Sequence, residues 1–417
     1  MRGKNSPEIR FPGFGGEWEQ MKLGEVVEIK DSARISNTLW VSKGVPYLRS
    51  SDLANDEIVG ELFISDETYQ SYKDKTGAPE KDDVLFTSGG KVGVTYHKID
   101  DNPVYVQGGS ILYAKTSTSN KLSGIYLKAF FSSPTMTKYI EGASTGLTIK
   151  HFTLKPANAA PIFISSLKEQ NKIGEFFKQI DDTIAFHQQE LTTLKQTKQG
   201  FLQKMFPKEG ESVPEVRFPG FTGDWEKREL KDVVDLLKDG THGTHKDGKE
   251  AFLLSAKNIK NGQIIIDELT DRKISSDDYN SIFKNYGLMD QDLLITIVGT
   301  IGQTALYTEN ITNTTKIAFQ RSVAIVRGNK DVNQIFLKSI VDSNHVQKQL
   351  KQSASMSAQA GVYLGDLAKL TMSIPKLSEQ IKIGNFIKQL DDIIALHQRE
   401  LDALKETKKA FLQKMFV

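Results

Sequence analysis

The chain has 417 residues, of which 38% are hydrophobic and 25% charged, with a net charge of +2 and no cysteine. This length predicts two or three folded units. The lack of cysteine excludes a disulfide scaffold, a cysteine-ligated zinc site and a thiol nucleophile. No apolar run is long enough to span a membrane, and Met1 to Phe14 lacks the apolar core of a signal peptide, so we expect a cytoplasmic protein.

The chain opens with a short segment that returns at the start of its second half. Residues 7–14 (Pro-Glu-Ile-Arg-Phe-Pro-Gly-Phe) recur as residues 214–221 with a single substitution, and a tryptophan follows each copy. Residues 11–15 also match the F-x-G-x-G signature of S-adenosylmethionine-binding enzymes. That signature lies between a strand and a helix, and the copy at 218–222 lacks the final glycine. We therefore assign no cofactor site to this segment.

The body that follows contains short runs rich in β-branched and aromatic residues. We predict strands at 45–49, 84–87, 92–96 and 110–114, and a helix at 125–131. Glycine and asparagine turns separate these runs, which favours a compact sheet or barrel in an α+β domain. Between two of the strands, Gly90 and Gly93 indicate a tight turn, although a close approach to a phosphate is an alternative.

A long helix closes each half of the chain. Residues 169–206 recur as 379–416 with most positions identical, and apolar residues alternate at spacings of three and four. This period predicts coiled-coil helices, each about 60 Å long for about 40 residues. We expect the two helices to pack antiparallel and to relate the two halves by a pseudo-two-fold axis. The central seam positions are Ile180, Ile184, His187 and Leu191 in the first copy and Leu390, Ile394, His397 and Leu401 in the second.

Two histidines, His187 and His397, occupy equivalent positions near the middle of this seam. A polar residue at a seam position usually fixes the register of a coiled coil, and that is the interpretation we favour. A metal site or a pH switch is the alternative, but it needs further ligands that the sequence does not identify.

The second body repeats the pattern of the first. We predict strands at 252–254, 263–266, 293–298 and 322–326 and a helix at 334–352, with Gly299 and Gly302 in the place of the earlier glycine pair. A stretch rich in threonine and histidine, residues 239–245, precedes these elements. It has no third ligand at metal-binding spacing, so we interpret it as a polar recognition loop and predict no metal site.

The shared segments and divergent bodies divide the chain into four parts. We predict a first body at 1–164, a central helix at 165–207, a second body at 208–374 and a C-terminal helix at 375–417. The same opening segment and closing helix flank two different bodies, which indicates two similar tasks performed on two different targets. Simple duplication followed by drift is the alternative.

Motifs for catalysis are absent from the sequence. There is neither an Asn-Pro-Pro-aromatic run for base methylation nor a G-x-x-x-x-G-K-[ST] loop for ATP. We therefore expect no catalytic residues and no cofactor in this chain. A cluster of nuclease carboxylates is harder to judge, because Asp and Glu are common residues.

Taken together, the Pro-Gly-Phe…Trp openings, the entries Leu167-Lys168-Glu169-Gln170 and Leu377-Ser378-Glu379-Gln380, and the shared ending Phe-Leu-Gln-Lys-Met-Phe resemble the specificity subunits of type I restriction–modification systems. The resemblance covers essentially the whole chain. It implies two target-recognition domains, each recognising half of a bipartite double-stranded DNA sequence, with paired helices that set their spacing. It further implies partners: two modification (methyltransferase) subunits and the restriction (translocase-nuclease) subunits. S-adenosylmethionine, ATP and Mg²⁺ would then bind to those partners.

Base recognition requires polar side chains that can reach base edges. The candidates for DNA binding are Arg34, Arg49, Lys91 and Tyr96 in the first body and Thr241, His242, His245, Lys246, Asn258, Gln303 and Arg321 in the second. Each of them could equally be a solvated surface group. Three other functions remain open at this point: the specificity subunit of a simpler two-component restriction enzyme, a coiled-coil scaffold that binds no DNA, and an enzyme in its own right.

Overall fold

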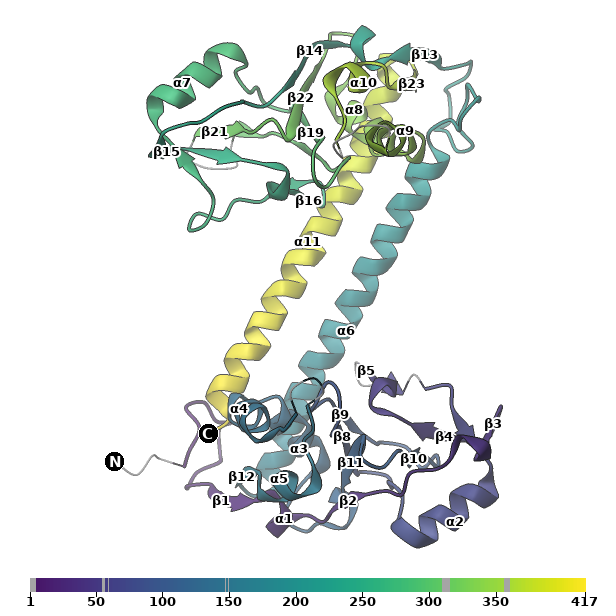
Figure 1. Ribbon diagram of the computed structural model, residues 1–417, viewed down its shortest axis with the longest axis vertical. Helices are drawn as coiled ribbons and strands as arrows, with labels where there is room; N and C mark the ends of the chain where they lie inside the picture. The colour runs from purple at the N-terminus through teal and green to yellow at the C-terminus, as the bar shows by residue number, and fades with distance from the viewer. Residues whose placement is uncertain are drawn as a thin grey trace. The chain divides into compact units, whose positions relative to one another are not determined.

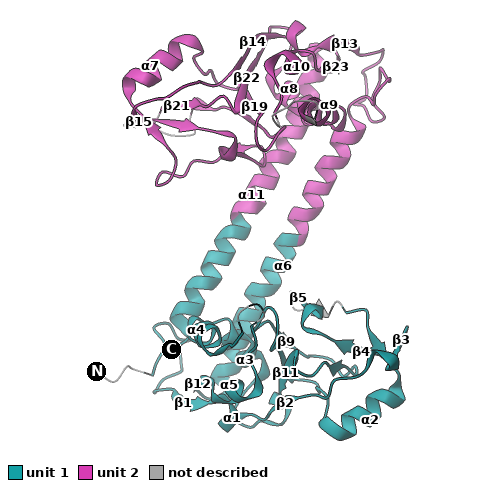
Figure 2. Ribbon diagram, viewed as in Figure 1, with its two compact units in different colours: residues 1–188, 400–417 teal, residues 189–399 magenta. Residues whose placement is uncertain are grey.

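The computed structural model describes residues 5–54, 57–58, 60–146, 148, 150–309, 316–355 and 361–417. It forms two compact units (Figures 1 and 2). Unit 1 comprises Met1–Gln188 and Glu400–Val417, and unit 2 comprises Gln189–Arg399. Each unit therefore holds one body, the beginning of one long helix and the end of the other. The predicted division into four parts stays a prediction.

Unit 1 is built on two four-stranded sheets and two short strand pairs, one of which joins β5 to β6. One sheet has the order β2-β11-β8-β9, the other has the order β10-β4-β7-β3, and β1 pairs with β12. The strands are β1 (Glu19–Lys22), β2 (Ile29–Asp31), β3 (Trp40–Val41), β4 (Val45–Leu48), β5 (Leu53–Ala54), β6 (Glu57–Ile58), β7 (Phe63–Ile64), β8 (Val84–Thr87), β9 (Thr95–His97), β10 (Tyr105–Val106), β11 (Ile111–Ala114) and β12 (Pro161–Ile164). The α-helices of this body are α1 (Leu23–Val26), α2 (Asp66–Thr76), α3 (Gly124–Phe131), α4 (Pro134–Ala143) and α5 (Leu154–Ala159).

Unit 2 repeats this plan. The sheet β14-β22-β19-β20 corresponds to the first sheet of unit 1, and β18-β15-β21 corresponds to the second. The strands are β13 (Glu226–Glu229), β14 (Val234–Asp239), β15 (Asp247–Leu254), β16 (Ile259–Lys260), β17 (Gln263–Ile264), β18 (Lys273–Ile274), β19 (Leu293–Thr296), β20 (Thr304–Leu306), β21 (Lys316–Phe319), β22 (Val323–Gly328) and β23 (Thr371–Ile374). The α-helices of this body are α7 (Ser276–Asn285), α8 (Gln334–Val341), α9 (Asn344–Ser355) and α10 (Leu364–Ala368). The predicted α+β fold of two similar domains is confirmed.

The central strands are continuous apolar runs because both of their faces are covered. In β8, Val84 and Phe86 belong to the core that contains α3, whereas Leu85 between them belongs to the core shared with β4 and β10. Strand β19 is divided in the same way, with Leu293 on one side and Leu294 on the other. Alternating side chains of a strand point to opposite faces, so each of these strands joins two cores within its own unit.

The two long helices are α6 (Leu167–Lys204) and α11 (Leu377–Met415). In unit 1 the beginning of α6 packs antiparallel to the end of α11, with the rings of Phe176 and Phe411 5.0 Å apart. In unit 2 the end of α6 packs against the beginning of α11, with Phe201 and Phe386 4.9 Å apart. The pseudo-two-fold relation between the halves stays a prediction.

The central seam positions lie on the inner side of these helices. Leu191 and Leu401 are each 1% exposed, and the other six are half-buried. Within unit 2, the Nδ1 atom of His397 lies 3.8 Å from a carboxylate oxygen of Glu190. None of the helices in the described part of the chain is long and apolar enough to cross a membrane.

Several predicted elements differ from the structure. The strand expected at 92–96 begins only at Thr95, after the glycine turn, and the strand expected at 263–266 ends at Ile264. The helix expected at 334–352 is two helices, α8 and α9, separated at Asp342 and Ser343. The Asp342 carboxylate accepts hydrogen bonds from Thr304 and from Lys338, and the Ser343 hydroxyl donates to the Ile340 carbonyl at 2.6 Å. The bond from Thr304 comes from a distant strand, and the bonds of Lys338 and Ser343 are local ones at the end of α8. Apolar periodicity predicts neither kind of contact, so the sequence pattern did not show the break.

Candidate nucleic-acid interface

The repeated opening segments attach both long helices to each body. Arg10 forms a two-bond ion pair with Glu169 at the start of α6, and the backbone N–H of Ile9 donates to the carbonyl of Lys414 near the end of α11 at 2.9 Å. Unit 2 has the same contacts, from Arg217 to Glu379 and from Val216 to Lys204. Hydrogen bonding to Glu169 raises the pKa of Arg10 above its ordinary value. These segments therefore hold the helices in place around each body.

A second repeated contact joins the two long helices, and in unit 2 it includes a lysine of the body. In unit 2, Lys198 of α6 lies 2.5 Å from Asp391 of α11, and Lys338 of α8 bonds to both Asp391 and Asp342. In unit 1 the corresponding pair is Lys408 and Asp181. Burial alone would lower the pKa of Lys338, but the two carboxylates outweigh it and raise the pKa. Sequence analysis did not identify this network, although its lysines and aspartates recur at equivalent positions of the two halves.

In unit 1, several loops meet at one end of the sheets. The N–H of Gln107 donates to Leu48 at 2.8 Å, and the N–H of Ser88 donates to Ser110 at 2.8 Å. With the amide oxygen of Gln107 facing Arg34, that guanidinium donates two bonds of 2.9 Å to it. We call the segments 31–36, 49–52, 88–94 and 107–110 the first loop cluster.

Three of the predicted DNA-binding residues lie in the first loop cluster. They are Arg34, Arg49 and Lys91. Arg49 pairs with Asp52, which is 4% exposed, while 43% of the Arg49 side chain remains accessible. Lys91 is exposed in the turn between Gly90 and Gly93, whose φ angles are 77° and 83°. The fourth residue, Tyr96, lies apart on β9, where it lines a hollow with Lys43 and Pro46.

The glycine pairs form tight turns in both units. In unit 1 the Thr87 hydroxyl donates to the Lys91 carbonyl at 2.5 Å and accepts from the Val94 N–H at 3.0 Å. In unit 2 Thr296 makes the same two bonds, to Thr300 and from Gln303. The turn predicted from the glycine spacing is confirmed. We call residues 87–94 and 296–303 the glycine hairpins.

The corresponding ends of the sheets in unit 2 form a second loop cluster, which consists of residues 239–246, 255–258, 297–303 and 320–322. The N–H of Thr241 donates to Phe319 at 2.7 Å, and that of Arg321 donates to Thr241 at 3.1 Å. The N–H of Ile297 donates to Ser322 at 2.9 Å and so brings the glycine hairpin to the same place. All seven residues predicted for DNA binding in this half belong to the cluster.

Their side chains differ in how they are engaged. His242 bonds to Asp239 at 2.6 Å and is 60% exposed, and Thr241 bonds to His245 at 3.0 Å. Arg321 is exposed, and the backbone N–H of Lys246 donates to Asp278. Asn258 is 4% exposed, and its amide donates to Ile265 and Asp271 and accepts from Ser255. Of this set, Asn258 is the residue held within the domain.

Comparisons with known proteins match the repeated architecture. A family model described as the type I restriction modification DNA specificity domain matches residues 15–196 and again 222–406. The type I restriction enzyme MjaVIII specificity subunit of Methanocaldococcus jannaschii is 22% identical over 306 residues, which cover 72% of this chain and 71% of the relative. The EcoBI specificity subunit of Escherichia coli is 26% identical over 288 residues, which cover 64% of this chain and 59% of the relative.

A solved structure has the same fold. The type I restriction–modification S subunit from M. genitalium aligns over 99% of both chains with a TM-score of 0.66 and 14% sequence identity. Because the family model spans most of the sequence in two copies, one in each half, the chain belongs to the type I restriction modification DNA specificity family.

Proposed function

We propose that the chain is the DNA specificity subunit of a type I restriction–modification complex, in which each body recognises one half of a bipartite target. The observation that carries this proposal is the pair of loop clusters. They occupy the same end of the same sheets in both units and are anchored by equivalent bonds, Gln107 to Leu48 and Gln320 to Leu254, each 2.8 Å. Their exposed side chains nevertheless differ, which two different half-sites require.

The exposed polar residues of the clusters are the proposed DNA contacts. Arg34, Arg49 and Lys91 supply cationic donors in unit 1, and Tyr96 is a further candidate that lies apart from them on β9. In unit 2, Lys246 and Arg321 supply cationic donors, and Thr241, His242, His245 and Gln303 supply further polar groups, while Asn258 supports the loop from within. Arginine and lysine can donate to guanine or to phosphate, and glutamine can bond to adenine.

The exposed faces of the long helices are alike and suit two copies of one partner. Lys178 and Asp182 form a 2.5 Å ion pair on α6, and Lys388 and Asp392 form the same pair on α11. Phe186 and Leu396 are equivalent exposed apolar residues, 58% and 49% accessible. We propose that modification subunits dock on these faces and that restriction subunits join the complex. The chemical steps, with S-adenosylmethionine, ATP and Mg²⁺, would then belong to the partners.

Random-site selection with the reconstituted methyltransferase complex tests the function. The expected result is enrichment of a DNA motif with two defined halves and an undefined spacer. Exchanging residues 20–165 for the body of another family member should change one half-site and leave the other intact. Failure to enrich any split motif would refute the proposal.

A further inference from the structure

Helices α4 and α9 occupy the same place in their units and share the same buried positions. Met136 and Ile140 of α4 are 0% and 6% exposed, and Val346 and Leu350 of α9 are both 0% exposed. Each helix also lies beside the glycine hairpin of its unit. A Cβ atom added at Gly93 would approach Ile140 to 3.0 Å, and one added at Gly302 would approach Gln347 to 2.6 Å. The scaffold that holds these two helices is therefore the same.

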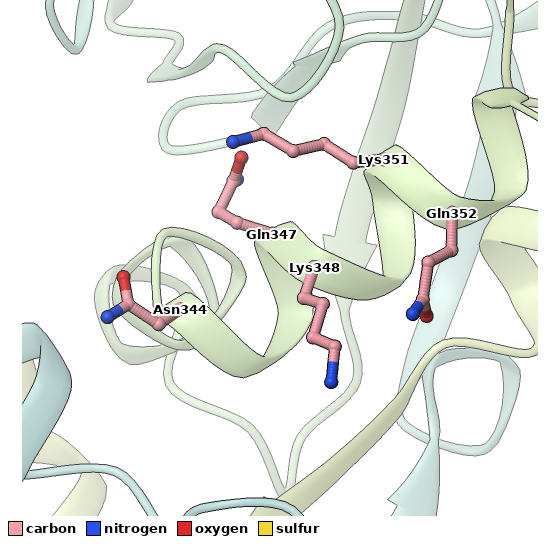
Figure 3. Close-up of a pocket in the computed structure, with 5 residues that line it drawn as sticks. All are labelled: Asn344, Gln347, Lys348, Lys351 and Gln352. Atoms are coloured by element: carbon pink, nitrogen blue, oxygen red, sulfur yellow. The ribbon is translucent and has the colours of Figure 1, made fainter.

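The outer surface of α9 has two edges (Figure 3). Gln347 and Lys351 project from one side of the helix, and Lys348 and Gln352 project from the other. The side-chain amide of Gln347 donates to the carbonyls of Gly302 at 3.0 Å and of Val341 at 2.9 Å, so its side adjoins the glycine hairpin. Lys348 forms a 3.0 Å ion pair with Glu209 on the opposite side. We call the side with Asn344, Gln347 and Lys351 the hairpin edge.

The two units differ along the hairpin edge. The positions of Asn344, Gln347 and Lys351 in α9 correspond to Pro134, Thr137 and Glu141 in α4. The far edge, by contrast, keeps its lysine, which is Lys138 in one helix and Lys348 in the other. The long helices show the opposite behaviour, since their exposed ion pairs are repeated. A surface that varies on a constant scaffold is expected where the two halves bind different targets.

The chemistry of the hairpin edge fits base recognition in the major groove, which admits an α-helix. Lys351 is exposed and carries donors for the O6 and N7 atoms of guanine, whereas Glu141 is exposed and carries acceptors for the N4 amino group of cytosine. Helix α9 carries two lysines and no acidic residue along its 12 positions. The hairpin edge also adjoins the second loop cluster, because Gln347 donates to the carbonyl of Gly302 within residues 297–303.

From this arrangement we infer that α9 and α4 are recognition helices, and that Lys351 and Glu141 determine one base of each half-site. Gln347 is a positioning residue that holds α9 against its hairpin. The inference rests on the proposed function, because it assigns specificity within that function. Lys351 selects guanine in the half-site of unit 2, and Glu141 selects cytosine in the half-site of unit 1.

The test is random-site selection with the full methyltransferase complex carrying Lys351→Glu, Lys351→Gln or Glu141→Lys. Each substitution is at an exposed position, and unchanged melting temperatures would establish that the variants fold. We expect Lys351→Glu to reduce the preference for guanine at one position of one half-site by about tenfold or more. Lys351→Gln should weaken the same preference, and Glu141→Lys should act on a cytosine in the other half-site.

Lys348→Ala is the matched control, because it removes the same charge from the far edge of the same helix. It should leave both half-sites unchanged. A uniform loss of affinity for all sequences in the Lys351 variants, with the motif preserved, would mean that α9 contacts phosphates and would overturn the inference. An unaltered motif and affinity would also overturn it. If the unsubstituted complex enriches no motif, the proposed function itself fails, so the two failures are distinguishable.

Discussion

Arg217 and Glu379 are joined by two hydrogen bonds, of 2.7 and 2.8 Å, although 162 positions separate them in the chain. Glu379 is almost fully buried, with 2% of its side chain exposed, and Arg217 is 17% exposed. A carboxylate removed from water in this way depends on its partner for compensation. The pair therefore fixes the opening segment of unit 2 to the first turn of α11.

Replacing Arg217 with alanine should destabilise unit 2 strongly. The substitution leaves Glu379 buried without its partner, and removal of one member of a buried pair costs about 3 kcal/mol or more. Urea unfolding of the full chain would measure the change. Arg228→Ala is the control, since Arg228 pairs with the exposed Glu226 and its removal should change the free energy of unfolding far less than the removal of Arg217. Equal effects of the two substitutions would contradict the structural role of the first.

A second prediction concerns Gly240, where two loops of the second cluster touch through their backbones. An added Cβ atom would lie 2.2 Å from the Phe319 carbonyl oxygen and 2.3 Å from that of Gln320. Gly240→Ala should therefore displace residues 239–246 from residues 320–322. We expect weaker binding at one half-site and no change in the preferred bases of the other.

The matched substitution is Gly365→Ala, because a Cβ atom there meets nothing within 4 Å and the residue lies in α10. It should leave binding unchanged. Gel-shift titration with targets mutated in either half-site would separate the effects. Normal binding by Gly240→Ala at both half-sites would show that this close approach is not required.

The stability of unit 1 should depend on pH through Asp52. Burial alone would raise the pKa of this carboxyl, but hydrogen bonds from the side chain and backbone of Arg49 lower it below its ordinary value. A carboxyl with a lowered folded pKa stabilises the fold above its unfolded pKa, about 3.9. That stabilisation is lost as the pH falls through the folded value.

Asp52→Asn should consequently lower the melting temperature at pH 7. The difference in melting temperature between the variant and the unsubstituted chain should disappear as the pH falls below about 4. Melting curves at pH 7, 5 and 3 would show this convergence. Asp101→Asn provides the control, because the side chain of Asp101 is 84% exposed and should matter little at any of these pH values. A difference in melting temperature that stayed constant with pH would argue against stabilisation by the ionised carboxylate of Asp52.

The sequence predicted those features that depend on local periodicity. Val84-Leu85-Phe86 and Leu293-Leu294-Ile295 are apolar runs of strand length, and both are buried central strands. The seam of α6 and α11 was likewise visible, because a period of three and four residues identifies one side of a helix. Repetition then showed that the two bodies have one fold.

Features that depend on distant partners were not predictable in this way. Asparagine is a residue type that often contacts DNA bases, so Asn258 was a candidate. Its amide is instead buried against Asp271, which no local pattern reveals. The break before α9 depends on Lys338 and Thr304, which bind Asp342 from another turn and another strand. Because α9 begins at Asn344, after this break, it is the counterpart of α4, which begins at Pro134. The differences between the two helix edges therefore emerge from the structure.

The spacing between half-sites should follow the length of the two long helices. Inserting seven residues into α6 after Leu191 and seven into α11 after His397 preserves the heptad pattern and both bodies. At 1.5 Å per residue the insertions add about 10 Å, which equals about three base pairs at 3.4 Å each. The enriched motif should therefore keep both half-sites while its spacer grows by about three.

Insertion into α6 alone is the control for this prediction. It breaks the pairing of Lys198 with Asp391 or of Lys408 with Asp181 and should impair the complex instead of lengthening the spacer. Single-molecule sequencing of methylated sites would report both outcomes. Both insertions lie outside the loop clusters, so the half-sites should not change. Altered half-sites with an unchanged spacer would show that the helices do not set the distance between the half-sites.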